Sequence, residues 1–287
     1  MIWIGLAIMI VSETATLFHV EPFWSWNTPI AWTGFIIFAD SIVYRARGDS
    51  WIRCAPGEFV LLALTSIPLW LVFEWFNLYI RNWHYTGLPE NFWLRYFGYA
   101  WAFATIWPAI FEGAELIGVV RARWVGRAGW DRHDSLVPPV HPGRPALPAL
   151  VGSAMLASPL LVSPDTARYL AAPVWLGFIF LLDPINARLG GDSLIAEWRA
   201  RRFDRTINLV LSGVLCGMLW EFWNYWAHAK WHYTVPIMEN LKIFEMPLPG
   251  YFGFSPFALE CFTMYEFLRR VVVRTASRTA SLRSIGV

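Results

Sequence analysis

Eight apolar segments recur along the chain, and most of them are long enough for a helix to cross a lipid bilayer. They cover residues 2–20, 29–44, 58–80, 96–120, 146–163, 170–186, 207–227 and 250–270. A helix needs about 20 mostly apolar residues to span the hydrocarbon core. Charged residues make up only 15% of the chain, whereas roughly 25% is usual in soluble domains. We therefore expect an all-α, polytopic membrane protein of about eight transmembrane helices.

The basic residues predict how these spans are oriented. Most of the 23 Lys and Arg residues lie in the loops 44–57, 121–145 and 186–206 and in the C-terminal tail. Loops rich in Lys and Arg remain on the cytoplasmic side of the membrane. The N-terminus lacks a basic segment and a small-residue cleavage site, so we interpret it as a first span. Both termini are therefore expected in the cytoplasm, in a bacterial inner (plasma) membrane.

The second half of the sequence repeats the first. Residues 32–50 align with 175–193 without a gap, and Asp40 corresponds to Asp183. Chance similarity between apolar helices would match Leu and Val, not acids, amides and histidines. The further matches are Glu74-Trp-Phe-Asn77 with Glu221-Phe-Trp-Asn224, Trp83-His-Tyr-Thr86 with Trp231-His-Tyr-Thr234, and Pro108 to Glu112 with Pro256 to Glu260. We expect two tandem four-helix repeats.

This duplication predicts the domain organisation. The first membrane repeat would cover residues 1–120 and the second 146–272, with a cytoplasmic linker at 121–145 and a basic cytoplasmic tail at 273–287. Because each repeat has an even number of spans, both insert in the same orientation. They would be related by a pseudo-two-fold axis along the membrane normal. Within the second repeat, residues 194–205 are typical of a short interfacial helix.

Two equivalent acid–amide pairs are the sharpest functional signal. Glu74 and Asn77 share a helix face, as do Glu221 and Asn224, because residues three apart are neighbours. Arg81 and His228 would follow on the same faces, two turns after the acids. Ionisable residues inside a membrane are costly and face the bundle interior or a water-filled cavity. We interpret both acids as candidate catalytic acids or bases, which Asn77, Asn224 and His228 would orient; the alternative is a polar clamp between helices.

A second pair of candidate catalytic carboxylates follows a proline in each half. Glu112 and Glu260 each lie four residues after a Pro, and a proline kinks a helix. The kink could aim the carboxylate into a cavity. Glu115 shares a face with Glu112, but Thr263 stands at the matching place in the second half. A structural carboxylate that shares a proton with a neighbour is the equally weighted alternative.

The Trp-His-Tyr-Thr motifs would lie just outside the membrane. Aromatic side chains commonly anchor helices at this level, which is the structural explanation for them. Alternatively they line a binding site, because Trp and Tyr faces stabilise cations by ~0.5–2 kcal/mol. The candidate substrate-binding residues here are Trp83, His84, Tyr85, Trp231, His232 and Tyr233.

Other signals point to structural roles or to no site at all. Asp40 and Asp183 each precede an Arg and a Gly-Asp-Ser turn, and we expect them to cap or pair with neighbouring groups. The three cysteines have no paired spacing, and the histidines have no local metal-ligand spacing. No nucleotide-binding fingerprint is present. We therefore predict no metal and no nucleic-acid partner.

On these residues, each half from its second span onward resembles the integral-membrane lycopene (carotenoid) cyclase family. That family shows an acid before a basic stretch, a Trp–acid pair, a Trp-x-Tyr-like stretch and a proline with carboxylates. The counterparts here are Asp183 to Arg188, Trp220-Glu221, Trp231 to Tyr233 and Pro256 to Glu260, and in the first half Asp40 to Arg45, Phe73-Glu74, Trp83 to Tyr85 and Pro108 to Glu112. This chain departs from the family in having Pro-x-x-x-Glu instead of Pro-x-Glu-Glu, and in an additional span per half.

The resemblance implies chemistry on a polyisoprenoid, in which a carboxylic acid protonates an alkene and aromatic faces shelter the carbocation. Related cyclases use reduced flavin, but no flavin motif is visible and we expect no cofactor. The leading hypothesis is a membrane-embedded enzyme that cyclises or isomerises an apolar lipid, which would be an isoprenoid or carotenoid. The alternatives are a proton-coupled lipid or small-molecule transporter and a membrane assembly or scaffold protein.

Overall fold

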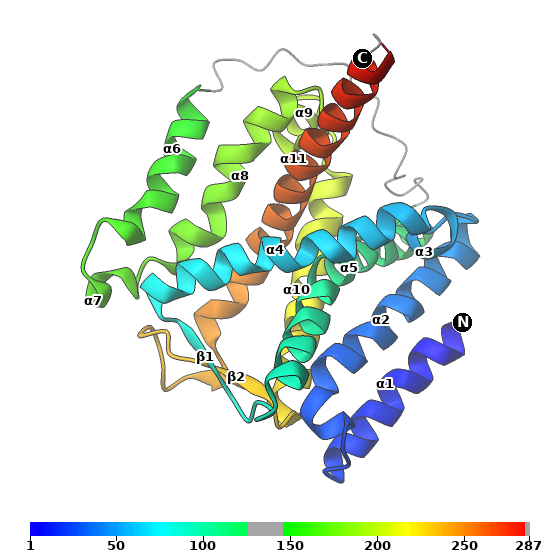
Figure 1. Cartoon of the computed structure of the whole chain (residues 1–287), viewed down its shortest axis with the longest axis vertical. Helices are drawn as coiled ribbons and strands as arrows, with labels where there is room; N and C mark the ends of the chain where they lie inside the picture. Colours follow the sequence, from blue (N-terminus) through cyan, green and yellow to red (C-terminus); the bar gives the residue numbers. More distant parts are fainter. Residues whose placement is uncertain (126–145, 285–287) are drawn as a thin grey trace.

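The computed structural model describes residues 1–125 and 146–284, which are mostly helical (Figure 1). Each predicted apolar segment coincides with a helix: α1 (Ile2–Leu17), α2 (Phe23–Arg47), α4 (Pro56–Ile80), α5 (Phe92–Val125), α6 (Ala146–Ala157), α8 (Ala171–Arg188), α10 (Asp204–Trp226) and α11 (Tyr251–Ser284). The short elements are α3 (Trp51–Cys54), α7 (Pro164–Ala167), α9 (Leu194–Arg199), two 3-10 turns (Ser158–Leu160 and Leu248–Gly250) and the strands β1 (Trp83–Thr86), β2 (Lys230–Tyr233), β3 (Lys242–Ile243) and β4 (Met246–Pro247). The helical fold class is therefore confirmed, with two small two-stranded sheets in addition.

Three of the described helices are long and apolar enough to cross a membrane. They are Pro56–Ile80, Phe92–Trp124 and Asp204–Trp226. Two shorter apolar helices, Ile2–Leu17 and Ala146–Leu160, fall below the length of a full span. Membrane association is supported at this coarser level, and the count of eight spans stays a prediction.

The helices form two outer pairs around a central group. α1 packs on α2 at one side of the molecule, and α6 packs on α8 at the other (Figure 1). Between them lie α4, α5, α10 and α11, with α5 against α10 and α4, and α11 against α8 and α10. This central group carries most of the candidate carboxylates, so the fold gathers them at its centre.

The outer pairs pack closely because glycines stand where the two helices cross. A Cβ on Gly5 would lie 2.5 Å from the carbonyl oxygen of Gly34, and one on Gly152 would lie 2.7 Å from that of Gly177. Small residues let helix backbones approach each other in this way, which is a common device in membrane proteins. Equivalent contacts therefore join the first two long helices of each half.

Three boundaries differ from the sequence prediction. α5 continues to Val125, past the predicted end of the first repeat at residue 120. α9 ends at Arg199 and not at residue 205, and a left-handed backbone at Arg201 (φ 56°) turns the chain into α10. α11 continues through most of the predicted tail to Ser284. The remainder of the predicted linker, residues 126–145, and residues 285–287 lie outside the described residues.

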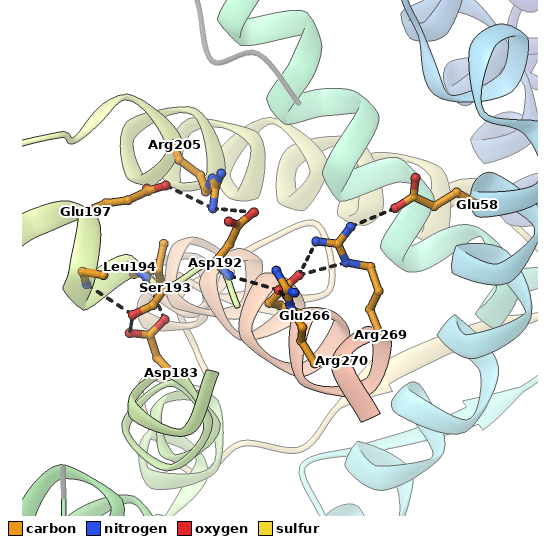
Figure 2. Close-up of polar contacts among 11 residues, drawn as sticks. Glu58, Asp183, Asp192, Ser193, Leu194, Glu197, Arg205, Glu266, Arg269 and Arg270 are labelled. Atoms are coloured by element: carbon orange, nitrogen blue, oxygen red, sulfur yellow. Dashed lines mark hydrogen bonds and ion pairs between the residues drawn. The ribbon is translucent and has the colours of Figure 1, made fainter. Parts of the chain in front are cut away.

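Asp183 organises the turn between α8 and α9, as expected for a capping residue. Its carboxylate accepts hydrogen bonds from the Ser193 hydroxyl (2.8 Å) and from the backbone N–H groups of Leu194 (2.7 Å) and Ile195 (2.9 Å) (Figure 2). In the first half the corresponding Asp40 accepts from the backbone N–H of Ile52 (2.9 Å). Both acids therefore fold the loop that follows their helix, and their role is structural.

A buried arginine lies next to this turn. Arg205 is 2% exposed and contacts the carboxylates of Asp192 (3.3 Å) and Glu197 (3.1 Å) (Figure 2). Its guanidinium also lies 4.8 Å from the centre of the Phe262 ring on α11. Burial raises the pKa of Glu197 to about 7, and this effect outweighs the opposing attraction of Arg205. Glu197 is thus a buried acid that titrates near neutral pH.

Glu266 on α11 completes the same polar region and links distant elements. It accepts from Arg270 (2.8 Å), Arg269 (3.0 Å) and the backbone N–H of Asp192 (3.0 Å) (Figure 2). Arg269 also reaches Glu58 at the start of α4 (3.3 Å). The network therefore ties α11 both to the α8–α9 loop and to α4 in the first half.

The glycine contact between α1 and α2 predicts the effect of a single methyl group. Gly5→Ala places a Cβ against backbone atoms of Gly34 and Phe38 that cannot move independently of α2. We expect a loss of about 1–3 kcal/mol of stability, the usual cost of overpacking, measured by thermal unfolding in detergent. Gly253→Ala is the matched control, because no atom lies within 4 Å of its Cβ position. Equal unfolding temperatures for the two variants would contradict the close contact.

Titration of Glu197 predicts a pH dependence of stability. The folded-state pKa of about 7 lies above the ordinary value of 4.5, so the folded state binds this proton more tightly. Stability is therefore highest below pH 4.5 and falls as the pH rises toward 7, by up to about 3 kcal/mol. Unfolding temperatures across this range should fall less steeply for Glu197→Gln than for the native chain. The exposed control Glu90→Gln should keep the native slope; identical slopes in all three proteins would refute this assignment.

Candidate functional site

A two-stranded ribbon brings the Trp-His-Tyr motifs of the two halves together. β1 and β2 pair antiparallel, with Trp83 opposite Tyr233, His84 opposite His232 and Tyr85 opposite Trp231. Alternate residues of a strand point to opposite faces. The tryptophans and tyrosines of both motifs therefore share one face of the ribbon, and the histidines share the other.

The aromatic face of the ribbon forms one wall of a cavity of about 430 Å³. The other walls come from α2, α4, α5, α8, α10 and α11, so both halves of the chain contribute. The aromatic residues that line it include Trp70, Trp83, Tyr85, Tyr99, Trp175, Trp220, Trp231, Tyr233 and Phe257. The motif residues were predicted from the sequence, and Trp70, Tyr99, Trp175, Trp220 and Phe257 were missed. Two of these had a signal in the sequence, because Trp70 lies one turn before Glu74 and Trp220 lies next to Glu221.

Glu74 lies behind this aromatic wall and is surrounded by donors. Its Oε1 accepts from Trp70 Nε1 (2.9 Å), Trp83 Nε1 (3.2 Å) and the Tyr85 hydroxyl (2.5 Å). All three donors line the cavity, whereas Glu74 itself does not. Three donors from the cavity wall therefore converge on one carboxylate oxygen.

Glu221 occupies the equivalent place in the second half, with fewer donors. It is fully buried, and its Oε1 accepts from the Tyr233 hydroxyl (2.9 Å), which in turn accepts from Trp231 Nε1 (2.8 Å). Its Oε2 is buried without a well-formed hydrogen bond, although Trp231 and the backbone N–H of Met246 lie nearby. Burial and the adjacent Glu221 raise the pKa of Tyr233 well above its ordinary value, so the hydroxyl is protonated in the resting protein. The two halves thus share a Tyr–Glu pair but differ in how well the carboxylate is solvated by donors.

The two asparagines position the ribbon and make no hydrogen bond to the acids. Asn224 donates to the Trp231 carbonyl (2.8 Å) and accepts from the Trp231 N–H (2.9 Å). Asn77 likewise donates to the Trp83 carbonyl (2.8 Å) and accepts from the N–H groups of Asn82 (2.8 Å) and Trp83 (3.2 Å). Each asparagine thereby brings the strand back over its own helix, where the tyrosine can reach the carboxylate.

Glu112 and Glu260 are buried deeper in the helix bundle. Glu260 is fully buried on α11, and its Oε1 accepts from the backbone N–H of Phe178 (3.1 Å). It lies one turn after Phe257, which lines the cavity, but it is not a lining residue. Glu112 is 1% exposed and also stands outside the lining. The neighbouring Glu115 forms an ion pair with Arg47 and is structural.

The histidines lie away from the cavity, contrary to their predicted role as substrate-binding residues. His84 is exposed on the outer face of the ribbon, and His232 contacts Glu245 (2.9 Å) and Thr86 (3.0 Å) there. His228 does not share a helix face with Glu221, because α10 ends at Trp226. Its ring lies 4.2 Å from that of Trp24 instead.

Arg81 was expected on the helix face of Glu74 and is also displaced. α4 ends at Ile80, and Arg81 follows with a left-handed backbone (φ 50°). Helical periodicity applies only within a helix. The predicted shared face was therefore wrong for Arg81 and His228, which lie past the ends of α4 and α10.

Comparison of the chain with protein-family models, with curated proteins and with solved structures found no match. The geometry of the cavity and of its two Tyr–Glu pairs therefore carries the functional argument.

The contacts of Asn224 predict the effect of an isosteric substitution. Asn224→Asp keeps the oxygen that accepts from the Trp231 N–H but replaces the donor to its carbonyl with a second oxygen. An unsatisfied buried polar group costs about 1–3 kcal/mol, so we expect a lower unfolding temperature. Asn91→Asp is the control: the exposed Asn91 only accepts, from the N–H groups of Trp93 and Leu94, and should be unaffected. Equal effects of the two substitutions would show that the ribbon does not depend on Asn224.

Proposed function

We propose that this protein is a membrane-embedded enzyme that uses acid–base chemistry to cyclise or isomerise an apolar lipid, and that this lipid is an isoprenoid. The observation that carries the proposal is the cavity, in whose wall the hydroxyls of Tyr85 and Tyr233 are hydrogen-bonded to the carboxyl groups of Glu74 and Glu221. Each tyrosine can exchange a proton between the cavity and the carboxyl group behind it.

The reaction is an internal proton transfer that leaves the redox state unchanged. Tyr233 gives its proton to a carbon–carbon double bond and takes one from the carboxylic acid of Glu221. The resulting carbocation closes a ring or shifts its charge, and then loses a proton to the oxygen of Tyr85 as that hydroxyl protonates Glu74. We assign the donating role to Glu221 because its Oε2 is buried without a well-formed hydrogen bond, whereas three donors converge on Oε1 of Glu74, which we assign as the accepting carboxylate. Exchange with water then returns a proton to Glu221 and removes one from Glu74.

Aromatic faces in the cavity suit a cationic intermediate. Trp70 and Trp220 lie 5.6 Å apart between ring centroids, and Trp175 packs 5.3 Å from Phe257. The face of an aromatic ring attracts a cation, and desolvation strengthens this attraction to about 2 kcal/mol or more. An apolar wall also excludes water, which would otherwise capture the cation.

The proposal includes the architecture predicted from the sequence: eight spans in two tandem repeats, with both termini in the cytoplasm. The series α1, α2, α3, α4, β1 and α5 has a counterpart in α6, α8, α9, α10, β2 and α11, with additional short elements between them in the second half. The Asn–strand and Tyr–Glu contacts recur in equivalent places. These correspondences support common descent of the halves, with the cavity at the interface between them.

The resemblance to membrane lycopene cyclases makes linear carotenoids the first substrates to test. Glu112 and Glu260 would then serve as deeper carboxylates below the cavity, because neither of them lines it. The proposal accordingly places Tyr85 and Tyr233, and not the four glutamates, in contact with the substrate.

A lipid analysis tests the proposed reaction. Cells that make linear carotenoids and other polyprenyl lipids would express the native chain, Glu221→Gln or Tyr233→Phe, and extracts would be compared by mass spectrometry. We expect a product isomeric with its precursor in the native strain and a loss of about 100-fold or more in each variant, the usual contribution of general acid–base catalysis.

Tyr79→Phe is the matched control, because this hydroxyl is on the exposed surface of α4 outside the cavity. It should leave product formation unchanged at equal protein levels. Identical lipid profiles in all strains would overturn the reaction on these lipids. Lipids that change location but not structure would instead favour a transporter.

A further inference from the structure

The charges around the cavity are of one sign. Among the residues that line it, Arg95 and Lys230 are the only ionisable groups apart from tyrosines, and both carry positive charge. Glu74 and Glu221 lie behind the wall and are held by the tyrosines. A purely hydrocarbon ligand would give no reason to place the guanidinium of Arg95 at the cavity surface.

Arg95 and Lys230 both belong to segments at the same end of the ribbon. Lys230 begins β2 and pairs with Thr86, the last residue of β1. Arg95 lies in the first turn of α5, and its Nε donates to the carbonyl of Pro89 (2.9 Å), three residues after Thr86. The segment between β1 and α5 therefore places Arg95 beside the end of the ribbon, whereas the Lys230 side chain points toward Glu245 on the histidine face.

Arg95 is the cation whose charge is available for a ligand. Lys230 is neutralised in part by Glu245 (3.3 Å), whereas Arg95 makes no ion pair with any residue of the described part of the chain. The side chain is nevertheless partly buried among aromatic residues. Its planar guanidinium retains donors suited to a carboxylate or phosphate.

Two neutral donors on α2 are also left without acceptors. Thr28 is 7% exposed and lines the cavity, and its hydroxyl has no hydrogen-bond partner among the described residues. Trp26 Nε1 is buried without a partner as well. It lies 3.4 Å from the Cβ position of Gly98 on α5, one turn after Arg95. A buried donor without an acceptor is costly, and an oxyanion entering the cavity would supply acceptors.

We propose that the cavity binds an amphiphile with an oxyanion head group, which Arg95 holds together with the Trp26 and Thr28 donors while the chain lies along the aromatic wall. The inference rests on the cavity of the proposed function being the substrate site. It adds that the lipid carries a carboxylate or a phosphate.

Binding of three probes that share one chain tests the head group. Native mass spectrometry of the purified full-length protein in detergent would measure the affinities for farnesyl phosphate, farnesoate and farnesol. We expect at least one of the two anions to bind about tenfold or more tightly than the neutral alcohol, as a charged hydrogen bond would give. The anion that binds more tightly identifies the preferred head group as phosphate or carboxylate. Equal affinities for all three probes would overturn the inference.

Arg95→Gln tests the residue assigned to the head group. It should reduce anion affinity by about tenfold and leave farnesol binding unchanged, which also shows that the cavity is still folded. Arg81→Gln is the control, since it removes the same charge from an exposed residue outside the lining. An equal loss of anion binding in the two variants would mean general electrostatic attraction and would refute the site.

The outcome is separable from that of the proposed reaction. Anion preference without any lipid conversion leaves this inference standing and removes the enzyme hypothesis. Conversion of neutral carotenoids without anion preference supports the reaction and removes this inference.

Discussion

The pairing of β1 with β2 is the contact on which the candidate site depends. It is the point at which the equivalent motifs of the two halves meet, and its register places two tryptophans and two tyrosines on one face. A two-stranded ribbon with only four residues in each strand is not stable by itself. Asn77 and Asn224 supply the missing stability by binding the strand backbones to the ends of α4 and α10. The ribbon, the aromatic wall and the Tyr–Glu pairs thus form one cooperative unit.

A separate polar region holds the molecule together elsewhere. Asp183, Arg205 and Glu266 are buried, and each is compensated by nearby hydrogen bonds or opposite charges (Figure 2). Buried charges are tolerated only when they are paired in this way. The fold therefore separates this set of paired charged residues from the Tyr–Glu pairs next to the cavity. This division explains why the chain can carry many acids in an apolar bundle.

Polar residues inside the first apolar segment illustrate the same principle. Ser12 and Glu13 weaken residues 2–20 as a membrane span by composition alone. In the structure the buried Asn27 accepts from the Ser12 hydroxyl (2.7 Å) and donates to Glu13 (2.9 Å), and Nδ2 also reaches the Trp223 carbonyl (3.3 Å). These contacts dock α1 on α2 and α10. A polar interruption of an apolar helix here marks a helix–helix contact.

Composition and pattern alone determined the helical class, the position of every long helix and the identity of the paired motifs, because apolar length and local repetition are properties of the sequence. Spacing also indicated the structural role of Asp183. The tertiary structure alone decided which residues meet in the cavity, since Trp175 and Trp220 reach it from different helices. It also decided the directions of the histidines: a strand alternates its side chains, and a helix face ends where the helix ends. Glu221 and Glu74 look equivalent in sequence, and the tertiary structure distinguishes them: Glu221 is fully buried with an Oε2 that has no well-formed hydrogen bond, whereas Glu74 is half-buried and accepts from three donors.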